Sequence, residues 1–161
     1  MIHYRQMVRS RIIWGWDMRG IDIAYDVAAN PDTVFAFLTD FERLRDWRTL
    51  ESLRTEPTGP LRIGTRLWTT VRGPGGLMAF TNEVTDLDPA RRFYRDRFLE
   101  GTFPIQSSWR IEEVNGGARI HWHTEYAGRG LLRLIAPFLG QAIRRGQLQD
   151  LKTLGKRFAA R

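Results

Sequence analysis

The feature that most constrains this chain is a run of five segments, between residues 66 and 128, in which apolar and polar residues alternate. Strict alternation is typical of β-strands with one buried face. The joints between the segments contain Gly, Pro, Asn or Asp, as sharp reversals require, and residues 115–117 are a strong hairpin signal. Such short joints predict antiparallel neighbours and therefore a meander. The five segments are 66–72, 77–87, 93–100, 104–114 and 118–126.

Different patterns flank this run on both sides. Residues 21–27 alternate like a further strand, with Ile21, Ile23, Tyr25 and Val27 on one face. Residues 30–39 predict a short helix capped by Asn30 with Pro31 in its first turn, and residues 40–47 a second one with Asp40 as its cap. The end of the chain predicts one long helix over roughly residues 131–158, in which Pro137 either causes a kink or marks the true beginning. The apolar positions of that helix are Leu131, Ile135, Phe138, Ala142, Leu148, Leu151 and Phe158.

These elements predict an α+β fold of one domain. A curved antiparallel sheet must cover its apolar face, and the long amphipathic helix is the available cover. A sheet curved around a helix leaves a cavity between the two, closed at one end by the two short helices. We assign residues 20–161 to this domain and residues 1–19, with Trp14 and Trp16, to an N-terminal extension that we interpret as carrying no function.

Composition excludes several classes of protein. With no Cys there is no disulfide framework, thiol nucleophile or Cys-ligated metal. No stretch reaches the ~18 apolar residues of a membrane span, and residues 1–17 lack the apolar core of a secretory signal. We therefore expect a soluble, cytoplasmic protein. The net charge of +7 is unevenly distributed: +3 over residues 1–19, −3 over residues 20–128 and +7 over residues 129–161. A basic end can meet nucleic acid, anionic lipid or an acidic partner, or it can simply be a solvated helix face.

Several segments together resemble a known family. The stretch VAANPDTVFAFLTDFERLRDW at residues 27–47 is similar to the opening of the START-like (SRPBCC) superfamily, in its polyketide cyclase/dehydrase and lipid-transport branch. Shorter matches follow in the same order at residues 63–66, 83–93, 116–120 and 151–158, so that the resemblance covers roughly residues 20–158. It implies the helix-grip fold, in which a curved antiparallel sheet and two short helices wrap a long C-terminal helix around a hydrophobic ligand pocket. It does not imply one reaction.

Alternation separates an inward face from an outward face along each strand. An aromatic-rich cavity with a few orienting polar groups has the make-up of a small-molecule site, although the same aromatics could simply fill the core. The strands at 66–72 and 93–100 are ambiguous: either Leu67, Thr69 and Val71 or Arg66, Trp68 and Thr70 face in, and either Tyr94, Asp96 and Phe98 or Phe93, Arg95 and Arg97. The candidate ligand-binding residues are Trp47, Phe80, Asn82, Tyr94, Ser107, Trp109, Trp122, Thr124, Tyr126 and Phe138.

Motifs for catalysis or metal binding are weak. His121, His123 and Glu125 share one face of a strand, but the apolar set lies opposite, so we interpret them as a polar outer face and expect no metal and no cofactor. There is no nucleophile elbow, P-loop or dinucleotide-binding glycine pattern. Cyclase chemistry leaves little signature in a sequence, so whether the chain is an enzyme stays open.

The resemblance and the charge pattern lead to three hypotheses about function. The first is binding of a hydrophobic small molecule such as a lipid, quinone or polyketide. The second is a polyketide cyclase/dehydrase-type enzyme. The third, weaker, is contact of the basic C-terminal helix with an anionic membrane or RNA. We expect no DNA partner and a monomer or homodimer.

Overall fold

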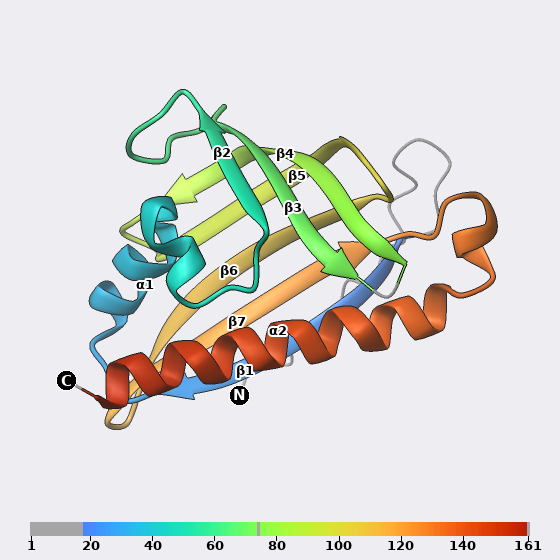
Figure 1. Cartoon of the computed structure of the whole chain (residues 1–161). Helices are drawn as coiled ribbons and strands as arrows, with labels where there is room; N and C mark the ends of the chain where they lie inside the picture. The colour runs from blue at the N-terminus through green and yellow to red at the C-terminus, as the bar shows by residue number, and fades with distance from the viewer. Residues whose placement is uncertain (1–17, 74, 161) are drawn as a thin grey trace.

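One antiparallel sheet of seven strands curves around a long C-terminal helix (Figure 1). The computed structural model describes residues 18–73 and 75–160. The strand order is β1-β7-β6-β5-β4-β3-β2, so the chain forms a meander from β2 to β7 and β1 lies at the edge next to β7. The elements are β1 (Arg19–Val27), α1 (Pro31–Thr39), the 3-10 helix η1 (Phe41–Asp46), β2 (Ser52–Glu56), β3 (Arg66–Gly73), β4 (Gly76–Asp88), β5 (Phe93–Gly101), β6 (Ile105–Val114), β7 (Gly117–Tyr126), the 3-10 helix η2 (Gly130–Arg133) and α2 (Ala136–Ala159).

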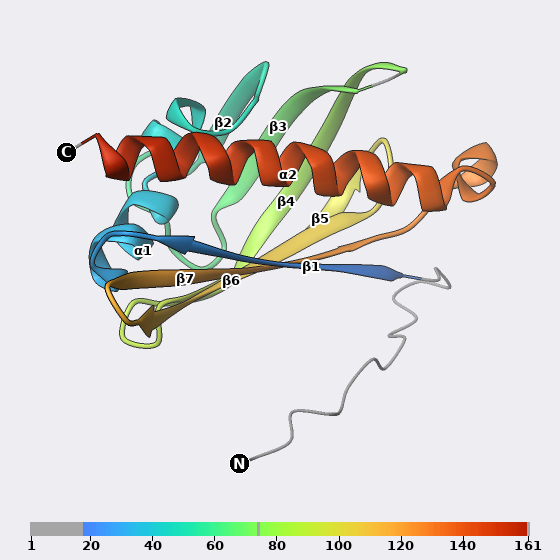
Figure 2. The ribbon, with the colours of Figure 1, turned by 90° about the horizontal axis from the view of Figure 1, so that it is seen from below.

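This architecture confirms the predicted α+β helix-grip fold. Helix α2 lies across the concave face of the sheet, and α1 with η1 closes one end (Figure 2). Six strands follow the short helices, one more than the five segments located from the alternation, because β2 adds a short edge strand to β3. Within residues 18–73 and 75–160, no helix is apolar enough over a sufficient length to cross a bilayer. The predicted extension with Trp14 and Trp16 falls almost entirely outside the described residues.

The two short helices begin as different local signals dictate. The Asn30 side chain accepts hydrogen bonds from the backbone N–H groups of Asp32 (2.9 Å) and Thr33 (3.3 Å), which caps α1 as predicted. Asp40 occupies the N-cap position of the second helix, as predicted. Its side chain makes no capping hydrogen bond there, and its carboxylate pairs instead with Arg43 at 3.3 Å. The second helix is a 3-10 helix of six residues.

Helix α2 begins later than its periodicity predicted. It starts at Ala136, not near residue 131, and Pro137 occupies its first turn, where the missing N–H does no harm. Pro137 therefore marks the beginning of the helix. Leu131 and Ile135 before the helix and Phe138 in its first turn do not join the core and are exposed, whereas Leu151 and Phe158 further along are buried.

The sheet is irregular where β4, β5 and β6 meet. Strand β4 shifts register against β5 at residues 81/82 and again at 84–86, and β5 pairs with β6 only from Phe93 to Arg95. Beyond Arg95 the two strands separate, so backbone groups of β6 on that side need other partners. Side chains of Asn82 and Asp96 supply them, and this substitution positions the polar part of the site described next.

Candidate functional site

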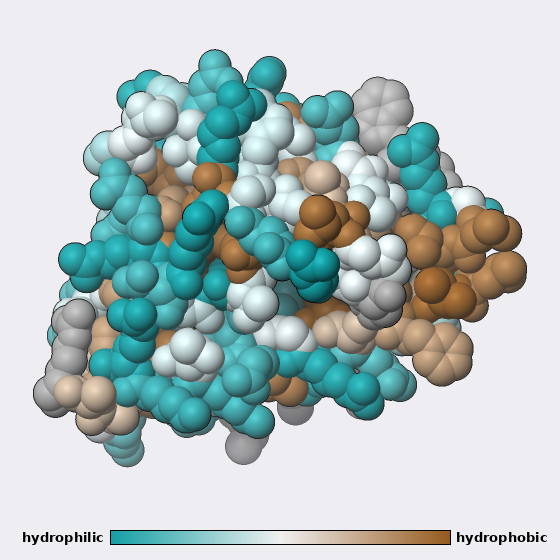
Figure 3. Space-filling model, in the orientation of Figure 1, coloured by the Kyte–Doolittle hydropathy of each residue, from teal (hydrophilic) through white to brown (hydrophobic). Residues whose placement is uncertain are grey.

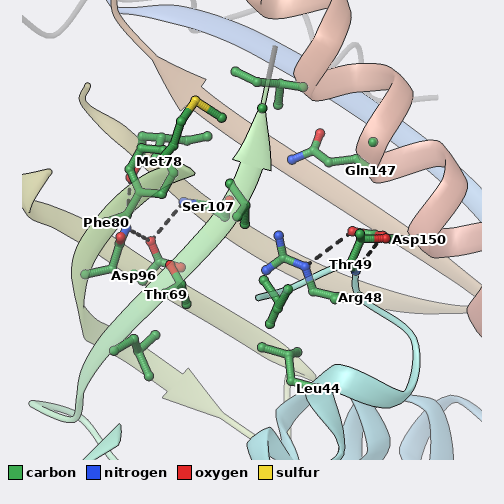
Figure 4. A pocket seen from close by; sticks show the side chains of 18 of the residues that line it. Leu44, Arg48, Thr49, Thr69, Met78, Phe80, Asp96, Ser107, Gln147 and Asp150 are labelled. Carbon is green, nitrogen blue, oxygen red and sulfur yellow. Dashed lines mark hydrogen bonds and ion pairs between the residues drawn. The ribbon is translucent and has the colours of Figure 1, made fainter. Parts of the chain in front are cut away.

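A cavity of about 340 Å³ lies between the concave sheet, the loop after η1 and helix α2 (Figure 4). Strands β3 to β6 form its floor, and α2 forms one wall. Most of the lining is apolar, as in typical small-molecule sites. The apolar lining includes Leu44, Leu50, Leu67, Val71, Met78, Phe80, Phe103, Ile105, Leu139 and Ile143.

The structure resolves both ambiguous strands. On β3, Leu67, Thr69 and Val71 face the cavity. Trp68 faces outward, where the Arg54 guanidinium of β2 lies 4.1 Å from its ring centroid. On β5, Tyr94 and Asp96 face the cavity.

The ten predicted site residues divide into three groups. Phe80, Asn82, Tyr94, Ser107 and Trp109 line the cavity. Trp122, Thr124 and Tyr126 face inward as predicted, but they and Trp47 are buried in packed core behind the lining and do not border the cavity themselves. Phe138 is wrongly placed by the sequence reasoning, because α2 begins only at Ala136 and leaves this ring 71% exposed. Whether the first five bind a ligand stays a prediction.

Aromatic rings fill the part of the core next to the cavity. The rings of Trp47, Trp109 and Trp122 pack edge to face with centroids 5.8–6.1 Å apart, and Tyr94 stacks on Trp109 at 4.6 Å. Edge-to-face and offset stacked contacts are the favoured aromatic geometries. Filled core and open cavity therefore occur side by side, and Trp109 belongs to both.

Asp96 is the centre of a polar network on the cavity floor. Its Oδ1 accepts hydrogen bonds from Asn82 Nδ2 (2.7 Å) and from the backbone N–H of Ser107 (3.1 Å), and its Oδ2 accepts one from the Tyr94 hydroxyl (2.9 Å). The Asn82 amide also donates to the carbonyl oxygen of Ile105 at 2.8 Å. The network thus replaces the missing β5–β6 ladder and holds a carboxyl group against an apolar cavity.

Burial shifts the pKa values of Asp96 and Tyr94. It raises the pKa of Asp96 to about 6, although the hydrogen bonds from Ser107, Tyr94 and Asn82 act in the opposite direction. Burial, followed by the charge of Asp96, raises the pKa of Tyr94 well above its usual value, so Tyr94 is a neutral donor at pH 7. A carboxyl group whose pKa lies near neutrality can both give and take a proton.

A second polar cluster faces Asp96 from the opposite wall. Asp150 of α2 accepts hydrogen bonds from the backbone N–H (3.1 Å) and hydroxyl (3.2 Å) of Thr49, and it pairs with Arg48 Nε at 3.5 Å. The Arg48 guanidinium also lies 5.1 Å from the Trp122 ring centroid. Sequence reasoning missed Arg48 and Asp150, although Asp150 is the single acidic residue of the basic stretch 129–161. That isolation was the available signal.

Gln147 adds an amide to the same wall. Its Nε2 donates to Thr124 Oγ1 at 2.6 Å, while its Oε1 has no hydrogen-bond partner among the described residues. Trp109 Nε1 is also without one in that part of the chain. Buried polar atoms in this state are stabilised by any water or ligand group that reaches them.

Three glycines interrupt α2, and they differ in what they face. A methyl group at Gly140 or Gly155 would overlap the hydroxyl of Tyr126 or Tyr25, so close helix–sheet packing requires these two glycines. A methyl group at Gly146 would meet nothing within 4 Å, although Gly146 borders the cavity. Gly146 therefore leaves open space beside the cavity.

His121 and His123 lie on the opposite face of the sheet from this site. His121 Nε2 is 2.9 Å from a carboxylate oxygen of Glu112, and His123 Nδ1 is 2.7 Å from one of Asp22. The hydrogen bond with Glu125 is the largest influence raising the pKa of His123, and the same contact lowers the pKa of Glu125 to about 2. Contacts with carboxylates on an outer sheet face account for these residues.

Comparison with known proteins places this geometry in a family. Residues 18–156 match the family described as polyketide cyclase/dehydrase and lipid transport. Among solved structures, the chain is similar to Zhui aromatase/cyclase from Streptomyces sp. R1128 (21% identity, TM-score 0.75), over 88% of this chain and 94% of the other. It is also similar to TTHA0849 from Thermus thermophilus (20%, 0.77, over 88% and 98%) and to ginseng major latex-like protein 151 from Panax ginseng (11%, 0.69, over 88% and 97%).

No curated protein matches the sequence. At these identities the solved structures establish the fold alone, whereas the family match extends over most of the sequence. The chain therefore belongs to the polyketide cyclase/dehydrase and lipid transport family of the START-like (SRPBCC) superfamily.

Proposed function

We propose that the protein binds one small, mostly apolar molecule in the cavity beneath α2. The observation that carries this proposal is an apolar cavity whose two walls each present a polar cluster, with Asp96 on one side and Arg48 with Gln147 on the other. Sites for small molecules combine an apolar lining with a few fixed polar groups in this way.

The chemistry of the walls defines the ligand class. A carboxylate has about four acceptor sites, and Asp96 uses three of them, so a ligand hydroxyl could occupy the fourth. The Arg48 guanidinium favours a carbonyl or carboxylate oxygen. A volume of about 340 Å³ is at the small end of ligand pockets. An oxygenated ring system, such as a quinone or aromatic polyketide, fits better than a lipid with two acyl chains.

Tryptophan fluorescence tests this binding directly, because Trp109 lines the cavity and contacts Trp47 and Trp122. We expect menadione, a naphthoquinone, to quench the emission with a saturable dependence on concentration. The variant Ala142→Phe, which places a ring in the cavity from α2, should weaken binding at least tenfold. Gln141→Phe adds the same ring at an exposed neighbouring position outside the cavity lining and serves as the control.

Native mass spectrometry of the purified protein supplies a second readout that needs no chosen probe. A co-purified small molecule that is lost in Ala142→Phe but kept in Gln141→Phe would support the proposal. Equal quenching of both variants by menadione would refute the proposal. So would the absence of saturable binding of both menadione and dodecanoate, if no small molecule co-purifies either.

The Tyr94–Asp96 pair favours a second candidate, an enzyme of the cyclase/dehydrase type. Dehydration needs a base that removes a proton from carbon and an acid that protonates the departing hydroxyl group. A cavity carboxyl group with a pKa of about 6 can perform both steps in turn. In that case Asp96→Asn should still bind the substrate but abolish its turnover, whereas a carrier should lose no function beyond affinity. Water loss from a β-hydroxy ketone analogue, followed by absorbance, distinguishes the two.

A further inference from the structure

Large apolar side chains are exposed together at one end of the molecule. Seven such residues are strongly exposed in the described part of the chain, and four of them fall between residues 131 and 138. These four are Leu131 (85% exposed), Leu134 (79%), Ile135 (48%) and Phe138 (71%), which we call the apolar end patch. It covers the chain leading into α2 and forms the brown area at the right of Figure 3. Contiguous exposed apolar surface of this kind indicates an interaction site.

Unpaired arginines accompany the patch. Residues 129–145 contain four arginines and no acidic residue, a net charge of +4. Elsewhere many arginines pair with carboxylates, as Arg119 does with Asp26. Within residues 18–73 and 75–160, none of the four arginines of this segment forms an ion pair, and Arg144 donates only to the backbone oxygen of Asp22. The four are Arg129, Arg133, Arg144 and Arg145.

The patch adjoins the lining of the cavity. Directly after Phe138, Leu139 and then Ile143 line the cavity from α2. Met78 also lines the cavity, from the start of β4, and its neighbour Leu77 is exposed. One end of the molecule thus combines exposed apolar side chains, unpaired positive charge and access to the cavity.

We propose that this end docks on an anionic membrane surface. The apolar end patch enters the boundary between headgroups and acyl chains, and the arginines contact lipid phosphates. The charge and the apolar residues together favour a membrane over a second copy of the chain or an RNA. A symmetric contact with a second copy would bring the same four arginines of both copies together. An RNA would meet the arginines but leave the leucines and Phe138 exposed.

Docking goes beyond the proposed function, because it requires no bound ligand. It would place the part of the cavity lined by Leu139 and Ile143 beside the bilayer, where apolar molecules are concentrated. The electrostatic attraction to lipid phosphates and the insertion of the apolar end patch should be separable. Replacing the arginines should weaken the attraction, and replacing the apolar residues should weaken the insertion.

Vesicle flotation tests the proposal with the full chain. We expect binding to vesicles of equal parts phosphatidylcholine and phosphatidylglycerol, weakened by salt, and little binding to phosphatidylcholine alone. The double variant Arg129→Gln, Arg133→Gln should lower the partition coefficient by about fivefold per arginine removed. The triple variant Leu131→Ser, Leu134→Ser, Phe138→Ser should bind the anionic vesicles more weakly than the unmodified protein does.

Matched controls lie in the loop between β2 and β3, away from the patch. Arg62 and Ile63 are both exposed there, and Arg62→Gln with Ile63→Ser should leave vesicle binding unchanged. Circular dichroism and Tm confirm that each variant is folded. Menadione quenching of the triple variant should persist, so that a failure of docking and a failure of cavity binding are distinguished.

Three results would overturn the proposal. The first is equal binding to neutral and anionic vesicles, or to neither. The second is an unchanged affinity of the triple variant for anionic vesicles. The third is a dimer of the unmodified protein that the triple variant abolishes, since a second copy would then cover the patch.

Discussion

Replacing Asp96 by Asn should change how the stability of the protein depends on pH. In the folded state burial raises the pKa of Asp96 to about 6, whereas in the unfolded chain it returns to about 4. The folded protein therefore holds the proton more tightly. Relative to a side chain that is always neutral, Asp96 makes no difference to stability at low pH, and the protein loses stability as the pH rises through 4 to 6. Asn cannot ionise, so the variant escapes this loss.

The size of the effect follows from the two pKa values. A shift of about two units corresponds to about 3 kcal/mol, because each unit is worth about 1.4 kcal/mol. About 2 kcal/mol of this falls between pH 4 and pH 7. The Asn amide can keep the contacts: its oxygen accepts from Asn82 and Ser107, and its NH₂ donates to the Tyr94 oxygen.

Urea unfolding of both proteins at several pH values between 4 and 7 measures this. Other titrating groups contribute equally to both proteins and cancel in the difference. The free energy of unfolding of Asp96→Asn, minus that of the unmodified protein, should increase by about 2 kcal/mol across the range. A difference that stays constant with pH, or decreases, would show that the cavity solvates the carboxylate and that burial does not raise the pKa of Asp96.

Three further predictions follow from packing and from the outer sheet face. Trp122→Ala should lower the free energy of unfolding by about 3–5 kcal/mol, because this ring is buried core; a loss below about 1 kcal/mol in urea unfolding would contradict that assignment. Gly146→Ala should increase the free energy of unfolding by up to about 1 kcal/mol and raise Tm. Gly140→Ala should lower Tm because its methyl group has no room, and a Tm change of the same sign in both variants would refute the packing argument. His121 and His123 should bind no stoichiometric metal, and elemental analysis that finds zinc or iron, lost in the double His→Ala variant, would overturn this.

Strict alternation determined much of the fold. On β1, β6 and β7 most of the apolar residues keep to one face, so the sequence alone indicated which side chains are buried, as Ile120 and Trp122 are. Local chemistry likewise determined the beginning of α1, since Asn30 caps it through its own neighbours. These features depend on interactions between residues close in the chain or on a pattern with a single period.

Where a strand carries apolar residues on both faces, the inward face could be assigned only from the tertiary structure. Trp68 is directed outward because Arg54 of the adjacent strand covers its ring, a contact that only strand pairing creates. The periodicity of the last helix counted Leu131 and Phe138 as core. The chain there projects past the end of the sheet (Figure 2), and both side chains are exposed.

The polar parts of the cavity depend on contacts between distant segments. Asp150 meets Thr49 about a hundred residues earlier in the chain, and Asp96 acquires its environment only where β5 separates from β6. The sequence determined which residues alternate inward, because burial of one face of a strand follows from its period. Only the tertiary structure decided which inward residues border open space and which fill the core, because that depends on how far α2 stands from each strand.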